Sequence, residues 1–178
     1  GIPLHHIWVI VWSVAGIVAL VAGMVWGSKL GVQFSLALVA LKARGVDPNA
    51  IDGILLSHLH GDHFGALPFL LLDAQFLTRR ERPLLIAGPP GTRARLDQSL
   101  ELLFPRSTTN EWRFSWKVME IEVARPTEVL GHGVTTTEVL HYSGAPSTAI
   151  VLSDGDKRFA YSGDTEWVDA LISVADGA

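Results

Sequence analysis

The sequence predicts a mixed α/β protein, of the α+β kind in its second half. In the first half, two short apolar runs at 53–56 and 83–87 each end in a polar or glycine-rich loop, which is typical of buried strands. In the second half, apolar and polar residues alternate at 118–123 and 134–142, as in strands with one buried face. With 178 residues, the chain is long enough for one domain with its own core.

Local signals justify the first elements in order. Residues 35–44 have an amphipathic helical pattern, and Gly45 is a stop signal for this helix. Asp47 can cap a following helical turn, and Pro48 suits the first position of that turn. The run at 53–56 is then a short buried strand, because it is apolar and too short for a helix.

The next elements alternate between helix and strand. The apolar stretch 64–76 is long enough for a helix, and the charged run 79–82 interrupts the chain after it. The strand at 83–87 ends at Gly-Pro-Pro-Gly, residues 88–91. Residues 92–104 carry leucines at helical spacing, which predicts a further helix.

The last third of the chain predicts a hairpin and a helix. Two short segments, 149–153 and 158–162, flank the turn sequence Asp-Gly-Asp at 154–156, which predicts two antiparallel strands. Residues 165–174 have the pattern of a final helix.

Charge and composition restrict the function. The formal net charge is −4 and the pI is about 5.9, which argues against a broad basic surface for nucleic acid. The chain contains no cysteine, so it has no disulfide and no thiolate ligand, and a metal would need His, Asp, Glu or water. The run Arg79-Arg80-Glu81-Arg82 could steer a phosphate or RNA, or could be a solvated turn.

The N-terminal segment is unusually apolar. Residues 7–26 contain no charged side chain, and a helix of about twenty such residues can span a membrane. Trp8 and Trp26 lie near its ends, as in an interfacial belt, and basic residues from Lys29 onward would keep the following domain in the cytoplasm. A cleavable signal peptide fits less well, because no lysine or arginine precedes the apolar run.

Two other interpretations of this segment stay open: a buried core element, or sequence that is not native to the protein. We therefore divide the chain into an apolar segment at 1–34 and a hydrolase-like domain at 35–178. The expected location is the cytoplasm, with membrane anchoring through residues 7–26 as the alternative.

Three of the seven histidines fall within six residues, directly after the strand at 53–56. His58 and His60 are two positions apart, so both imidazoles can converge on one ion. Asp62 and His63 follow at the turn into the next helix, where they can face a second ion, and Gly61 lets the backbone bend between the pairs. Zn²⁺, Mn²⁺ and Fe²⁺ accept this mixture of nitrogen and oxygen ligands, so the cluster predicts a metal site.

The run from His58 to His63 resembles the HxHxDH signature of the metallo-β-lactamase superfamily. Two later stretches match in the same order, at 140–143 (Leu-His-Tyr-Ser) and 161–165 (Tyr-Ser-Gly-Asp-Thr). The strand at 83–87 with its Gly-Pro-Pro-Gly is similar to the ribonuclease Z and phosphodiesterase branch. The resemblance implies an αββα sandwich, here incomplete at both ends.

The resemblance also implies a role for each matching residue. His58, His60 and His141 would bind one ion, with His132 as a competitor for the place of His141. Asp62 and His63 would bind the other ion, and Asp164 would bridge the two. Asp62 would also act in catalysis by orienting the attacking water.

The implied activity is that of a hydrolase in which a hydroxide activated by two divalent ions attacks the substrate. Zinc is the expected ion, with manganese or iron as alternatives, and the substrate would be a phosphodiester in RNA or a small cyclic nucleotide. A lactonase, thioesterase or arylsulfatase shares the same metal core, and a homodimer is expected from this branch.

The sequence also departs from the family pattern, which leaves a second class of function open. The family supplies a last metal-binding histidine from near its C-terminus, but no histidine follows His141. The family's opening strands, and an aspartate before the helix that precedes the motif strand, have no counterpart in the first residues. The chain could therefore be a truncated or membrane-tethered domain that binds metal without catalysis.

Overall fold

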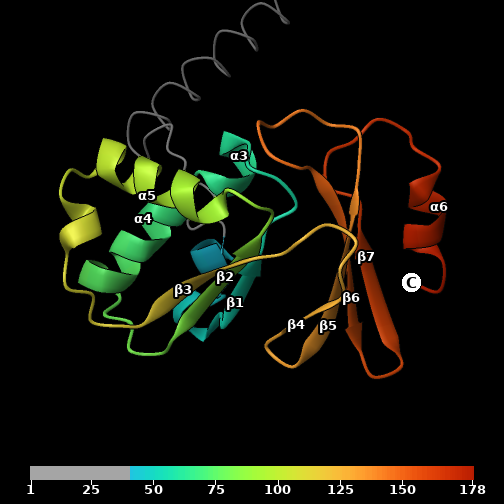
Figure 1. Cartoon of the computed structure of the whole chain (residues 1–178). Helices are drawn as coiled ribbons and strands as arrows, with labels where there is room; N and C mark the ends of the chain where they lie inside the picture. Colours follow the sequence, from blue (N-terminus) through green and yellow to red (C-terminus); the bar gives the residue numbers. More distant parts are fainter. Residues whose placement is uncertain (1–40) are drawn as a thin grey trace, which may run out of the picture.

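The computed structural model describes residues 41–178, which form four layers in the order helix, sheet, sheet, helix (Figure 1). Helices α3, α4 and α5 cover the outer face of a three-stranded sheet, and α6 covers the outer face of a four-stranded sheet. The inner faces of the two sheets pack against each other. This arrangement confirms the expected αββα sandwich.

The first sheet has the order β1-β2-β3 and is parallel, and the second has the order β4-β5-β6-β7 and is antiparallel. The strands are β1 (Gly53–Leu55), β2 (Leu84–Gly88), β3 (Trp116–Glu120), β4 (Thr127–Val129), β5 (His132–Glu138), β6 (Thr148–Asp154) and β7 (Lys157–Tyr161). The helical elements are η1 (Pro48–Ala50), α3 (Gly61–Phe64), α4 (Leu67–Leu72), the π-helix η2 (Asp73–Leu77), α5 (Thr92–Leu103), η3 (Ser107–Thr109) and α6 (Ala170–Ala175).

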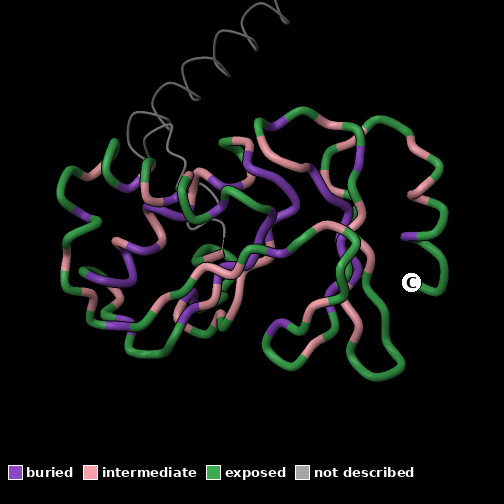
Figure 2. The backbone as a smooth tube through the Cα atoms, viewed as in Figure 1, coloured by how far each residue is buried: buried purple, intermediate pink, exposed green. Residues whose placement is uncertain are grey.

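Alternation along the strands builds the layers. On β2, Leu84 and Ile86 pack against the helices, while Leu85 and Ala87 face the second sheet. The strand β6 alternates in the same way between the inter-sheet core and the core under α6. Figure 2 shows that the buried stretches follow the strands and the loop from β1 to α3. Because that loop lies between the two halves of the sandwich, side chains on it are held from both sides.

The chain enters the domain through a helix end that the sequence predicted. Residues 41–43 are helical, and Gly45 follows with φ +72°. The N–H of Val46 donates to the carbonyl of Leu41, and the N–H of Gly45 donates to that of Lys42. This double closure needs a left-handed residue at position 45, which glycine adopts without strain. The expected helix stop is therefore confirmed, while most of the helix at 35–44 lies outside the described residues.

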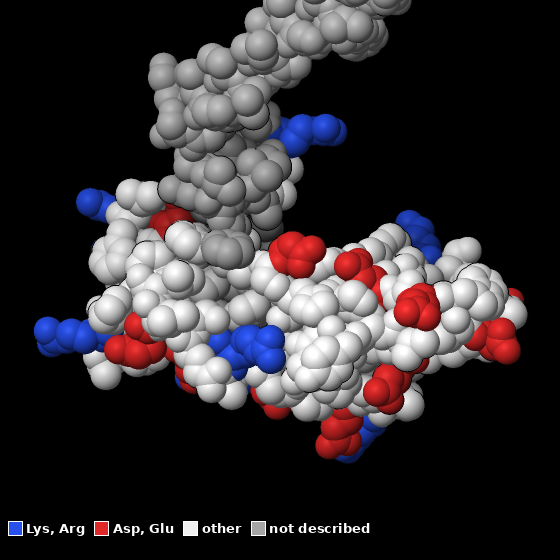
Figure 3. Space-filling model, turned by 90° about the horizontal axis from the view of Figure 1, so that it is seen from above, with Lys and Arg blue, Asp and Glu red and all other residues white. Residues whose placement is uncertain are grey.

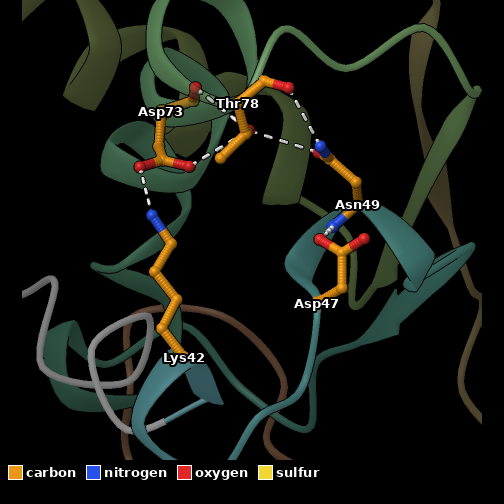
Figure 4. A network of polar contacts seen from close by, with 5 residues as sticks. All are labelled: Lys42, Asp47, Asn49, Asp73 and Thr78. Atoms are coloured by element: carbon orange, nitrogen blue, oxygen red, sulfur yellow. Dashed lines mark hydrogen bonds and ion pairs between the residues drawn. The ribbon is translucent and has the colours of Figure 1, made fainter.

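A polar network joins this helix end to the π-helix (Figure 4). The Lys42 ammonium lies 2.6 Å from the carboxylate of Asp73, whose side chain is only 7% exposed. The Thr78 hydroxyl contacts both Asp73 and Asn49, and the backbone N–H of Asn49 donates to the capping carboxylate of Asp47. The predicted cap at Asp47 is thus confirmed, on a short 3-10 turn.

The apolar stretch at 64–76 forms three consecutive helical pieces instead of one helix. The first piece, α3, ends at Phe64, and α4 begins at Leu67. Pro68 lies in the first turn of α4, where its missing N–H is tolerated but cannot continue a hydrogen-bond ladder from α3. The last residues of the stretch, from Asp73 onward, form the π-helix η2.

In the second half, the bounds of three elements differ from the prediction by two residues or more, and β4 was missed. The strand expected at 118–123 is β3, which ends at Glu120, and the strand expected at 134–142 is β5, which ends at Glu138. The helix expected at 165–174 begins only at Ala170. The residues expected to begin this helix pair with the loop after β5 instead, because the N–H of Glu166 donates to the carbonyl of Leu140.

No helix within residues 41–178 is long and apolar enough to cross a membrane. The described residues do not include the span expected at 7–26 or the segment 1–34. The cellular location inferred from that segment stays a prediction. The boundary between 1–34 and 35–178 stays a prediction.

Candidate metal centre

The loop after β1 carries the histidine cluster and is fixed by both sheets. The N–H of Leu56 donates to the carbonyl of Ala87 on β2, which continues the pairing of the first sheet. The carbonyl of Ser57 accepts two bonds of 2.9 Å from Thr148 on β6, one from its N–H and one from its hydroxyl. His58 follows directly and is fully buried. The ring of His58 is therefore placed between the sheets by backbone bonds on either side.

Three histidines converge at this edge of the sandwich. His58 and His60 lie on the β1 loop, and His141 lies on the loop that follows β5. The Nε2 atom of His141 is 2.9 Å from Nδ1 of His60, and one ring nitrogen from each of the three lies within 4.8 Å of the others. The ring planes of His60 and His141 are nearly perpendicular, at 89°. Three nitrogens converging from perpendicular rings can form three corners of a tetrahedral zinc site.

A second group lies beside the first and shares His58 with it. Ligand atoms of His58, His63 and Asp164 lie within 4.8 Å of one another. The Nε2 atom of His63 is 3.4 Å from a carboxylate oxygen of Asp164, in the segment between β7 and α6. The structure does not bring Asp62 into either group: its side chain is 79% exposed, and its carboxylate is 3.8 Å from Nε2 of His63. Five of the six expected ligands therefore converge, and Asp62 lies at their solvent side.

The position of His132 separates it from this site. It is the first residue of β5, while His141 lies beyond the other end of the same strand. A strand of this length spans about 20 Å. The Nδ1 atom of His132 lies 3.5 Å from the carboxylate of Asp154, at the turn end of the second sheet. The structure thus places His141, and not His132, beside His60.

The surroundings of His58 favour a neutral imidazole with one nitrogen left for a ligand. The Ser57 hydroxyl lies 3.0 Å from Nδ1 of His58, while the buried Nε2 has no hydrogen-bond partner among the described residues. Burial lowers the pKa of His58, the neighbouring His63 and His141 lower it further, and Asp164 acts in the opposite direction. A buried imidazole nitrogen without a partner, beside nitrogen and carboxylate ligands, fits a divalent metal ion.

The loop that carries His141 is braced by short-range contacts. The buried Ser143 hydroxyl donates to the carbonyl of Ala145 and lies 3.0 Å from the hydroxyl of Ser147. The N–H of Val139 donates to the carbonyl of Ser147, which closes the loop at its base. These contacts fix the loop, so His141 is held in place before any ion binds.

Gly163 packs closely against Ser57, the residue before His58. It has φ +63°, and a Cβ added there would lie 3.0 Å from the Cβ of Ser57 and 3.0 Å from the carbonyl of Thr148. A side chain at this position would therefore push on Ser57, whose hydroxyl contacts His58. Gly155 has a similar φ of +57°, but an added Cβ would meet nothing within 4 Å.

We expect Gly163→Ala to lower the free energy of unfolding by about 2–3 kcal/mol, because left-handed strain of about 1–2 kcal/mol adds to the clash with Ser57. We also expect it to weaken zinc binding by about tenfold, as changes behind a ligand do. Gly155→Ala carries only the backbone strain and serves as the control. Urea unfolding and zinc titration of both variants measure the two effects, and equal zinc affinities would contradict the expectation.

The family model "Metallo-beta-lactamase superfamily" matches residues 21–177. The chain belongs to this superfamily. Among curated relatives, a ribonuclease Z of Methanocaldococcus jannaschii is 34% identical over 112 residues, which cover 61% of this chain and 33% of the relative. A ribonuclease Z of Staphylococcus epidermidis is 31% identical over 97 residues, which cover 54% of this chain and 29% of the relative. The resemblance to the ribonuclease Z branch is thereby confirmed.

Solved structures show the same fold. The short form of human tRNase Z aligns with a TM-score of 0.59 at 21% identity, over 77% of this chain and 59% of that one. The metallo-beta-lactamase fold protein YhfI from Bacillus subtilis aligns with a TM-score of 0.55 at 19% identity, over 77% of this chain and 51% of that one. The superfamily domain seen here thus corresponds to a little over half of each of these chains, in agreement with the predicted incomplete sandwich.

The supporting residues of the centre were not found from the sequence. Gly163 carried a signal, since it stands in the Ser-Gly-Asp-Thr stretch at 162–165. Ser57 and Thr148 carried none, because their roles come from a contact between residues 91 positions apart.

Proposed function

We propose that this chain supplies the metal-dependent site of a phosphodiesterase that acts on RNA. The observation that carries the proposal is the meeting of two groups of ligand atoms, one of three histidines and one of two histidines and a carboxylate, which share His58. The names of the relatives support the substrate class, because the curated ones are called ribonuclease Z and one solved structure is a tRNase Z.

The proposed ligands of the first ion are His58, His60 and His141. His63 and Asp164 would hold the second ion, together with the exposed Asp62 carboxylate, which lies 3.8 Å from Nε2 of His63 on the solvent side. Zinc suits a set of imidazoles and carboxylates, and manganese or iron can use the same ligands. A count of two ions, rather than one, belongs to the proposal.

Divalent ions, when bound here, would polarise the phosphoryl group and bring the pKa of water close to neutrality. The side chains of the chain would hold the ions and take up the proton of the attacking water. The exposed carboxylate of Asp62 can accept a hydrogen bond from the attacking water and take up its proton. Burial lowers the pKa of His58, which favours its neutral form, and its buried Nε2 has no hydrogen-bond partner among the described residues.

The charge on the site face is consistent with local recognition of a phosphodiester. Figure 3 shows the molecule from above, with scattered acidic side chains, fewer basic ones between them and no broad basic surface on the described part that is visible. Attraction for the substrate would therefore come from the ions and their immediate neighbours. A small cyclic nucleotide also carries a phosphodiester that could be bound without a broad basic surface. Pairing into a homodimer stays a prediction.

The test is a panel of substrates offered to the chain after metal removal and zinc restoration. We expect hydrolysis of bis(p-nitrophenyl) phosphate and of a short RNA, with no turnover by the metal-free protein. A lactone, a thioester and an aryl sulfate complete the panel. Faster hydrolysis of one of these would replace the proposed substrate class, and a chain that binds zinc without hydrolysing any of them would be a non-catalytic metal-binding domain.

A further inference from the structure

Arg95 lies where the two histidine-bearing loops meet. It is a half-buried residue of α5, and its Nη1 atom donates to the carbonyl of Leu59 at 3.0 Å. Leu59 stands between His58 and His60 on the β1 loop. On the other side, a Cβ added to Gly144 would lie 3.1 Å from Nη2 of Arg95. Gly144 follows His141 by three positions, so the guanidinium touches both loops of the three-histidine group.

Among residues 41–178, the side chain of Arg95 uses little of its hydrogen-bonding capacity. A guanidinium has five N–H donors, and the bond to Leu59 is the only one that the guanidinium of Arg95 makes to residues 41–178. Arg80 shows how this protein treats a structural arginine, because its guanidinium makes five bonds to backbone carbonyls. The contrast indicates that Arg95 holds the loop with one donor and keeps the others for a group outside the chain.

The chemistry of a guanidinium defines that group. Its planar set of donors matches the oxygens of phosphate or carboxylate, and it keeps its charge at any physiological pH. The site beside it is the one for which we propose phosphodiester hydrolysis, and a phosphodiester brings one negative charge with two non-bridging oxygens. Among the described residues, Arg95 is the only lysine or arginine whose side chain hydrogen-bonds to either histidine-bearing loop.

We propose that Arg95 is the residue that binds the phosphoryl group of the substrate, donating to its non-bridging oxygens from the α5 side of the site. This inference rests on the proposed function for its substrate class. The bond to Leu59 orients the guanidinium, and a phosphate bound at His60 and His141 completes its hydrogen bonds.

The test compares Arg95→Ala and Arg95→Lys with Arg93→Ala. Arg93 is also on α5, is exposed, and pairs with Asp97 at 2.8 Å, so its loss removes one positive charge from the same helix without touching the loops. Each variant of the 178-residue chain is stripped of metal and restored with zinc. The measurements are zinc content, the Kd for inorganic phosphate by calorimetry, and KM and kcat for bis(p-nitrophenyl) phosphate.

We expect unchanged zinc content in all variants. The Kd for phosphate should rise by about ten- to a hundredfold in Arg95→Ala, the range for a lost charge-assisted pair of bonds, and by less in Arg95→Lys, which keeps the charge but not the planar fork. Arg93→Ala should bind phosphate as the wild type does. The same order is expected for KM in the hydrolysis of the diester.

A wild-type Kd for phosphate in a zinc-loaded Arg95→Ala variant would overturn the proposal. So would loss of zinc from both Arg95 variants, because Arg95 would then only support the loops. If Arg95→Ala alone fails to fold, the Kd of Arg95→Lys for phosphate tests the proposal, since the lysine can keep the bond to Leu59. Arg95-dependent phosphate binding in a protein that cleaves no phosphodiester would refute the proposed function and leave the anion site standing.

Discussion

Replacing His60 with alanine is expected to weaken zinc binding by more than about a hundredfold, because even changes behind a ligand cost ten- to a hundredfold. The reason is geometric: His60 is the partner of His141 at 2.9 Å, and without it only two of the three converging nitrogens remain. Hydrolysis of a phosphodiester should fall with the zinc content. Metal analysis after dialysis against a weak chelator measures the first effect, and initial rates measure the second.

The matched control is His132→Ala. It removes a histidine that lies at the far end of β5 from His141, next to Asp154. We expect this variant to keep the zinc content and the rate of the wild type. Zinc loss in His132→Ala, or zinc retention in His60→Ala, would mean that the ligand set is not the one proposed.

The largest expected effect on stability comes from Arg80. Its side chain is 3% exposed, and its guanidinium lies 5.9 Å from the ring centre of Phe114. Its five bonds go to the carbonyls of Pro48, Asn49, Ile51, Arg82 and Pro83. These residues precede β1 and β2, so one side chain ties together the entrances of two neighbouring strands.

We expect Arg80→Ala to lower the free energy of unfolding by about 3–5 kcal/mol, since one buried and four part-buried bonds to carbonyls are lost at once. Arg80→Lys should recover only part of this, because an ammonium has three donors and no planar fork. Arg82→Ala is the control: Arg82 pairs with Asp52 at 2.6 Å on the surface, and such a pair contributes about 0–1 kcal/mol.

Urea unfolding followed by circular dichroism measures these differences. If Arg80→Ala and Arg82→Ala lose similar stability, the network around Arg80 contributes little.

The structure already corrects both interpretations of the run at 79–82 for Arg80. Arg80 is neither a solvated turn residue nor free to steer a phosphate, since its donors are bound to carbonyls.

The sequence by itself determined the features that depend on neighbouring residues. The stop at Gly45, the cap at Asp47 and the helix at 92–104 follow from local conformational preferences. The spacing of His58, His60 and His63 after a buried strand was enough to predict a metal centre, because a strand and its loop place these side chains together. The Asp-Gly-Asp turn sequence between two short segments predicted β6 and β7.

Only the tertiary structure decided the features that depend on contacts between distant segments. The order of motifs already favoured His141 over His132, but only the structure shows which end of β5 faces the β1 loop. The exposed place of Asp62, the burial of Arg80 and the position of Arg95 between two loops follow in the same way from how layers pack. A local pattern records which residues a segment can bury, but it does not record which atoms of another segment will face them, and that pairing sets the chemistry of the site.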